Sequence, residues 1–167
     1  MKKTTKQPSQ RSPAERPDRP SPAEDAFPRD QIPSIRRVMM PRDTNAFGTI
    51  FGGVILSEID LAAAVEAHRH HAGRLVTVAM DGVIFRAPVH VGDCVSFYTE
   101  TLRIGRTSIR VKIRVWAEAR FSTGKEVFVT EAEATMVAVD ETGRKVPLRP
   151  KGRSRDPSRQ SNPSSST

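Results

Sequence analysis

Two kinds of hydrophobic pattern divide the central part of the chain. Over residues 54–65, apolar and small side chains occupy every side of a helical wheel for three turns, so the pattern predicts a helix without a solvated face. Over residues 108–118, isoleucine and valine alternate with polar residues, which predicts a strand with one face in a core. Because a helix that is apolar all round is normally buried, we expect a sheet to cover this helix.

Turn signals between these segments define the remaining elements. In chain order we predict a strand over 32–40, the helix from 54 to about 71, and further strands over 74–85, 94–104, 108–118 and 128–139. The fold class is therefore α+β, with an antiparallel sheet wrapped around one long central helix. In so small a domain part of the helix and some strand edges stay uncovered, and dimerisation would cover them. We therefore expect a homo-oligomer.

Composition separates this domain from both ends of the 167-residue chain. Residues 1–31 and 150–167 are rich in Pro, Ser, Arg and Lys, which predicts disordered tails on either side of one domain at 32–149. The tails contribute +2 and +3 to the formal net charge of +8. The domain itself is only mildly basic, and the chain has one Trp and one Tyr for base stacking. We therefore expect no nucleic-acid binding.

Cysteine and histidine usage narrows the cellular setting. The single Cys94 excludes an intramolecular disulfide and fits a reducing compartment. No apolar run approaches the ~20 residues of a membrane span, and no apolar segment of a signal peptide follows the N-terminal lysines, so we predict a cytoplasmic protein. His68, His70 and His71 crowd the helix C-terminus, where polar groups favour the helix dipole, and we expect no metal site there.

Two carboxylates, Glu58 and Asp60, fall on nearly opposite sides of the predicted helix. An ionised carboxylate is almost never fully buried without a partner. Either one of them is a catalytic base or nucleophile, or both reach solvent or an arginine at a subunit boundary. The small side chains around Asp60 leave room for a ligand and favour Asp60. Just before the helix, Gly52 and Gly53 place unpaired N–H groups where they can face a ligand carbonyl or anion.

Three basic residues, Arg110, Lys112 and Arg114, share the polar side of the most clearly alternating strand. If the last predicted strand pairs antiparallel with it, Glu131 and Glu133 lie opposite these basic residues. We favour this cross-strand ladder over phosphate binding as the explanation of the basic row.

One stretch closely resembles a known family. The segment PRDTNAFGTIFGG at 41–53, followed by SEID at 57–60, is similar to the hotdog-fold acyl-CoA thioesterases, the group that includes bacterial broad-specificity acyl-CoA hydrolases and the brain-type cytosolic acyl-CoA hydrolase. The resemblance covers about residues 34–148 and excludes the tails. Its further motifs, in the same order, are VTV at 76–78, FRAPV at 85–89, VGD at 91–93, GRTS at 105–108, VW at 115–116 and VAVD at 137–140.

The resemblance implies a hotdog fold in which two subunits pair, active sites lie at the dimer interface, and dimers often assemble as trimers of dimers. It places the catalytic carboxylate on Asp60 and its partner on Asn45 of the opposing subunit. Glu58 falls where the family often has a neutral residue. Asp60 would act as general base or as a nucleophile that forms an anhydride, and the N–H of Gly52 or Gly53 would polarise the thioester oxygen.

The phosphates of CoA require basic groups near the mouth of the pocket. By analogy with the matching turn of the family, Arg106 with Thr107 and Ser108 is the first choice for this role, and Arg86 is the second. No cofactor is expected, because coenzyme A is part of the substrate.

The prediction from the sequence is therefore an enzyme, an acyl-CoA thioesterase that releases a free carboxylic acid and CoA. An alternative of another class is a non-catalytic acyl-CoA sensor that keeps the pocket and uses the basic tails for a partner. The presence of both Asn45 and Asp60 argues against a sensor, because a pure binding site has no use for a buried base. Hydratase chemistry would bring a catalytic histidine on or near the helix, whereas His68 is two turns beyond Asp60.

Overall fold

The computed structural model describes residues 27–119 and 125–149. The two predicted tails lie almost entirely outside these ranges. The described elements are strand β1 (Ile35–Val38), the short 3-10 helix η1 (Pro41–Asp43), helix α1 (Gly52–Ala67), and strands β2 (Arg74–Asp81), β3 (Cys94–Ile104), β4 (Ser108–Glu118) and β5 (Glu126–Val139).

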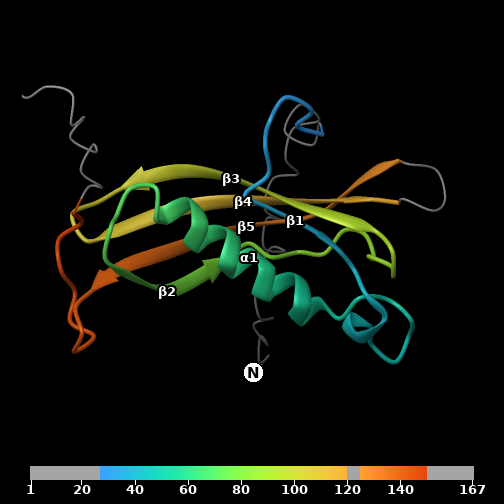
Figure 1. Ribbon diagram of the computed structural model, residues 1–167, viewed down its shortest axis with the longest axis horizontal. Coiled ribbons are helices and arrows are strands. Elements are labelled where there is room, and N and C mark those ends of the chain that lie inside the picture. Colours follow the sequence, from blue (N-terminus) through green and yellow to red (C-terminus); the bar gives the residue numbers. More distant parts are fainter. Residues whose placement is uncertain (1–26, 120–124, 150–167) are drawn as a thin grey trace, which may run out of the picture.

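The five strands form one antiparallel sheet in the order β1-β3-β4-β5-β2. Strands β1 and β2 are therefore the two edges, although they flank the helix in the sequence. Figure 1 shows the sheet curling around α1, which lies across one of its faces. This is the predicted α+β architecture, and it places the helix between the two edge strands.

The predicted boundaries of β3 and β4 are confirmed, and the four others shift. Strand β1 spans only Ile35–Val38 of the predicted 32–40. Strand β2 ends at Asp81 rather than 85, because Gly82 adopts a left-handed φ of 78° that interrupts the extended backbone. Strand β5 begins two residues earlier than predicted, at Glu126. Helix α1 begins at Gly52 and ends at Ala67, where the N–H of Arg69 turns back to the carbonyl of Glu66 at 3.0 Å.

The core lies between α1 and the sheet. Ile55, Ile59 and Ala62 on the helix pack against a sheet face that includes Phe97 and Ile113, and all five are buried. Burial on all sides of the helix, as the wheel predicts, is wrong for a single chain, because one sheet covers only one side. The outer side of α1 exposes large apolar side chains, including Leu61 at 54% and Val65 at 44%.

Two residues of the basic row on β4, Arg110 and Lys112, are paired with carboxylates of β5, as predicted. Arg110 Nε lies 2.6 Å from Glu133 Oε2, and Lys112 Nζ lies 3.4 Å from Glu131 Oε2. In the register Lys112 is opposite Glu133, so these ion pairs run diagonally across the two strands. The ladder accounts for Arg110 and Lys112 within the chain and leaves no reason to invoke phosphate there.

Candidate active site

The loop between η1 and α1 folds on itself around Asn45. Its backbone N–H donates to the carbonyl of Thr49 at 2.8 Å, and Gly48 closes the turn with a φ of 81°. The Asn45 side chain accepts from the N–H groups of Phe47 (2.8 Å) and Thr49 (3.3 Å) and donates to Thr49 Oγ1 at 2.8 Å. Asn45 therefore shapes the loop that carries it, and one amide hydrogen has no partner among the described residues.

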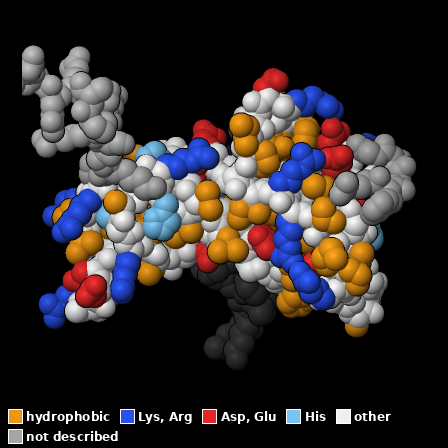
Figure 2. Space-filling model, in the orientation of Figure 1, with side chains coloured by type: hydrophobic (Ala, Val, Ile, Leu, Met, Phe, Trp, Pro, Cys, Tyr) orange, Lys and Arg blue, Asp and Glu red, His pale blue; other side chains and the backbone are white. Residues whose placement is uncertain are grey.

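Helix α1 begins where this loop ends, with Phe51 as the N-cap and the two glycines as its first residues. The N–H groups of Gly52 and Gly53 have no partner in the part of the chain that the structure describes, as is usual in the first turn of a helix. A Cβ on Gly53 would lie 2.4 Å from the ring of Phe51, so only glycine fits without moving that ring. Figure 2 shows hydrophobic side chains gathered around this end of α1, where Phe51 and Phe85 are exposed.

A pocket of about 320 Å³ opens beside the helix N-terminus. Gly52 and Arg86, both predicted site residues, line it together with Thr49 and Phe85. The guanidinium of Arg86 lies 5.5 Å from the ring centroid of Phe128, a distance typical of a cation–π contact. The structure thus brings one proposed oxyanion donor and one proposed phosphate-binding arginine to the same cavity.

Asp60 lies half-buried on the side of α1 that faces the edge strand β2. Thr77, on β2, donates its hydroxyl to Asp60 Oδ1 at 2.5 Å. No other hydrogen bond or ion pair to the Asp60 side chain occurs within 27–119 and 125–149. Asp60 Oδ2 is therefore available to a water molecule or a substrate.

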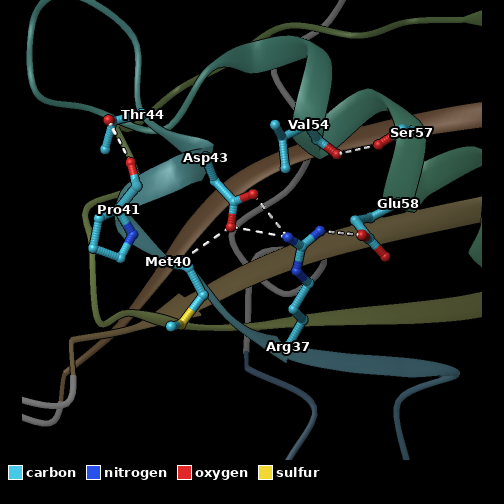
Figure 3. Close-up of polar contacts among 8 residues, drawn as sticks. All are labelled: Arg37, Met40, Pro41, Asp43, Thr44, Val54, Ser57 and Glu58. Atoms are coloured by element: carbon cyan, nitrogen blue, oxygen red, sulfur yellow. Dashed lines mark hydrogen bonds and ion pairs between the residues drawn. The ribbon is translucent and has the colours of Figure 1, made fainter.

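Glu58 is buried on the other side of α1 and faces β1. Its partner is Arg37 of β1, which donates Nη1 to Glu58 Oε1 and Nη2 to both oxygens of Asp43, at 2.8 and 2.9 Å (Figure 3). The N–H of Met40 and the Arg37 guanidinium lower the pKa of Asp43, against the opposing effect of burial. Glu58 thus has an arginine partner within its own chain, not at the predicted subunit boundary.

Arg37 and Asp43 are the residues that sequence reasoning missed. Asp43 stands two positions before Asn45 in the motif, and Arg37 lies between the apolar residues of a short strand. Neither local pattern indicates that the two side chains meet, since the contact depends on how β1 and η1 pack against the helix.

The other predicted CoA-binding residues lie elsewhere in the chain. Arg106 and Thr107 belong to the β3–β4 turn and Ser108 begins β4. Figure 1 places this turn at the end of the sheet away from the start of α1. The hydrogen bond of 2.9 Å between His70 Nε2 and Thr101 Oγ1 ties this end of β3 to the helix C-terminus. Within one chain, this turn therefore does not reach the pocket at Gly52 and Arg86. Asn45 and Asp60 of the same chain are not hydrogen-bonded to each other either.

The histidines at the helix C-terminus have structural partners. The buried ring of His71 accepts the N–H of Arg149 at Nδ1, at 2.9 Å. Within the described ranges no group of three or more His, Cys, Asp or Glu could hold a metal ion. No helix in the described part of the chain is both long enough and apolar enough to cross a membrane.

Comparison with known proteins gives consistent matches. Residues 47–120 match the family model described as the thioesterase superfamily. An uncharacterized acyl-CoA thioester hydrolase of Haemophilus influenzae is 45% identical over 112 residues, which cover 66% of this chain and 73% of that protein. The acyl-CoA thioester hydrolase YciA of Escherichia coli K12 is 41% identical over 112 residues, which cover 66% of this chain and 85% of that protein.

Solved structures show the same architecture. HI0827, a hexameric broad-specificity acyl-coenzyme A thioesterase, aligns with a TM-score of 0.67 at 42% identity over 71% of this chain and 81% of its own. Cj0915, a hexameric hotdog-fold thioesterase of Campylobacter jejuni, aligns with a TM-score of 0.64 at 42% identity over 70% of this chain and 90% of its own. The predicted fold and the predicted resemblance are both confirmed.

Proposed function

This chain belongs to the hotdog-fold thioesterase superfamily, and on that premise we propose that it hydrolyses acyl-CoA to a free carboxylic acid and CoA. The observation that carries the proposal is the environment of Asp60, a half-buried carboxylate with one hydroxyl partner and one oxygen available. The names of the relatives support catalysis over the non-catalytic sensor. We propose Asp60 as the catalytic carboxylate.

The chemistry follows from the groups present. Asp60 takes a proton from water as the water oxygen attacks the thioester carbonyl, and the N–H groups at positions 52 or 53 hold the developing oxyanion. These N–H groups would come from another subunit, because within one chain they lie about 10–12 Å along α1 from Asp60. The C–S bond then breaks, and the proton held by Asp60 returns to the departing thiolate of CoA. Alternatively, Asp60 attacks the carbonyl directly, the C–S bond breaks, and the thiolate of CoA leaves as an anhydride forms. Water then hydrolyses the anhydride to the carboxylic acid and protonated Asp60, whose proton passes to the thiolate. In either course Thr77 fixes one oxygen of Asp60 and leaves the other to react.

We propose that the site is completed by other copies of the chain. HI0827 and Cj0915 are hexameric, and a homodimer that assembles into a trimer of dimers agrees with the exposed apolar side of α1 in this chain. In this assembly Asn45 would come from the partner subunit. Arg106 with Thr107 and Ser108 would bind CoA phosphates together with Arg86, which lines the pocket at the helix N-terminus.

The decisive experiment is hydrolysis of a panel of acyl-CoAs of different chain length, with release of free thiol followed for wild type and for Asp60→Asn. Loss of the base should lower kcat by ~10²–10⁴. The control is Glu133→Gln, which removes a carboxylate from the outer face of the sheet, where Glu133 pairs with Arg110. No hydrolysis at any chain length would contradict the proposed function, and unchanged kcat in Asp60→Asn would exclude Asp60 from the mechanism.

Mixed oligomers test the shared site. When Asp60→Asn and Asn45→Ala subunits assemble at random, a twofold dimer with shared sites regains roughly a quarter of its intact sites. We expect activity to return to about that fraction of wild type. Assembly of mixed oligomers without recovery would show that each chain supplies both residues itself.

A further inference from the structure

A single arginine ties β1 and η1 to α1, the helix that carries Gly52 and Asp60 of the candidate site. Arg37 extends from β1 and contacts Asp43, the last residue of η1, and Glu58 on α1 (Figure 3). The side chains are 28%, 8% and 12% exposed, respectively. The three charges are therefore largely withdrawn from water, where ion pairs are screened least.

Asp43, which Arg37 contacts, is also hydrogen-bonded to the start of the helix. Its backbone carbonyl accepts the N–H of Phe51, the N-cap of α1, at 2.8 Å. Its carboxylate also accepts the N–H of Met40 at 3.0 Å, so Asp43 is held at both its side chain and its backbone. Asn45 follows two residues later, and the loop from Asp43 to Phe51 is closed at its base by these bonds.

Glu58, the other carboxylate that Arg37 contacts, lies on the same helix as Asp60. It lies two residues before Asp60, on the opposite flank of the same turn region of α1. Holding Glu58 against β1 fixes the rotation of the helix about its own axis. That rotation determines where Asp60 stands relative to Thr77 on β2.

We propose that Arg37 is a positioning residue of this active site, and that it acts by bridging Asp43 and Glu58. The inference rests on the proposed hydrolase function. Arg37 touches neither Asp60 nor Asn45, so its role is geometric. Arginine suits it because the planar guanidinium presents several donors in a fixed fork, whereas a lysine ammonium is a point charge on a flexible stem. A lysine can pair with one of the two carboxylates but cannot reproduce the rigid bridge.

The test uses Arg37→Met and Arg37→Lys in the full chain. We expect kcat for acyl-CoA hydrolysis to fall by about 10²-fold in Arg37→Met, because misplacement by 1 Å costs about this factor. Arg37→Lys should lose about 10-fold by the same argument. KM should change far less than kcat, since the substrate contacts themselves remain. Hydrogen–deuterium exchange should become faster in the peptide that spans 43–53 and stay unchanged in β3 and β4.

Arg36→Met is the matched control. Arg36 neighbours Arg37 on β1, but its guanidinium pairs with the carboxylate of Glu118 at 2.6 Å and is largely exposed. We expect wild-type kcat and wild-type exchange over 43–53 in this variant. If Arg37→Met has the same kcat and the same exchange rate over 43–53 as Arg36→Met, the proposal is overturned. If Arg37→Met does not fold, kcat and loop exchange are measured in Arg37→Lys instead. Wild-type values of both quantities in Arg37→Lys would overturn the proposal.

The two readouts separate this inference from the function on which it rests. A wild-type protein that hydrolyses no acyl-CoA contradicts the proposed function, and loop exchange in the Arg37 variants then still measures whether the bridge holds 43–53. Faster exchange that is uniform across the loop and the core strands, with an unchanged kcat, would show that Arg37 stabilises the fold in general. That result would also overturn the positioning role.

Discussion

The two edges of the sheet treat the two helix carboxylates in opposite ways. At the β1 edge, Glu58 is buried and neutralised by Arg37, which also binds Asp43. At the β2 edge, Asp60 is only half-buried, and the hydroxyl of Thr77 is its single partner among the described residues. A carboxylate paired with a buried guanidinium is held by its surroundings, whereas one that keeps a free oxygen can accept a proton or attack a carbonyl.

The two edges also differ in what covers them. Strand β2 exposes Val76 at 42% and Val78 at 55%, and its outer backbone groups face no neighbouring strand in the described chain. An exposed edge with valines is a template for pairing with another chain. Asp60, which has no charged partner among the described residues, therefore stands beside the strand β2 whose exposed valines can pair with a second copy. Glu58 stands beside β1, which Arg37 ties to η1 and α1.

Among the variants that test this contrast, we expect the largest loss of assembly and of kcat when charges are placed on the β2 edge. In Val76→Asp/Val78→Asp, charges on the edge strand should prevent pairing with a second copy. We expect the oligomer to dissociate and kcat to fall by about 10²-fold or more, because the shared site then loses residues placed by the partner. Light scattering coupled to size-exclusion chromatography measures the mass, and the thiol-release assay measures kcat.

The matched control places one equivalent charge at the other edge. Val38→Asp lies on β1, where Val38 is also partly exposed, and should leave the mass of the oligomer unchanged. Dissociation by Val38→Asp alone, with the β2 variant still assembled, would reverse the assignment of the two edges.

The sequence predicted local structure well because local patterns determine it. Strict alternation was sufficient to place β4, and the acidic residues of β5 could be matched to its basic row. The wheel separated Glu58 from Asp60 by side, and the small neighbours of Asp60 favoured it. The assignment of Asp60 as the catalytic carboxylate, however, came from the family resemblance.

The remainder of the site could not be predicted, because it depends on contacts between distant segments. The wheel could not show that Leu61 stays exposed in one chain, since this depends on how far the sheet reaches. The bridge from Arg37 to Asp43 and Glu58 requires β1 to pack beside the helix, which no periodicity encodes. For the same reason, the roles of Asn45 and Arg106 stay predictions that rest on an assembled oligomer.

Removal of the hydroxyl that contacts Asp60 should have an intermediate effect on kcat. Thr77→Val keeps the shape of the side chain and removes the hydroxyl that donates to Asp60 Oδ1. Hydrogen bonds to charged groups contribute about 1.5–3 kcal/mol, so we expect kcat to fall by about 10-fold with the oligomer intact. Thr135→Val, on the adjacent strand β5, is the control and should retain wild-type kcat. Equal activity of the two variants would mean that Thr77 does not orient Asp60.

The smallest expected effect concerns the β1 edge and its response to acid. The N–H of Met40 and the guanidinium of Arg37 lower the pKa of Asp43 in the folded chain. Asp43 therefore stabilises the fold above its ordinary pKa of about 3.9, and this contribution is lost as the pH falls through the lowered folded value. Asp43→Asn should reduce the free energy of unfolding at pH 7 and make it fall less steeply below about pH 4, as measured by urea denaturation across pH.

Asp140→Asn is the control for Asp43→Asn in the measurement of stability against pH. The hydroxyl of Thr142 and the backbone N–H of Arg144 also lower the pKa of Asp140, but Asp140 lies in a turn after β5 and has no arginine bridge to a helix. Its substitution should shift the pH dependence in the same direction and by less. A larger shift for Asp140 than for Asp43 would mean that the β1 edge is not held by charge, and the contrast between the two carboxylates of α1 would then need another cause.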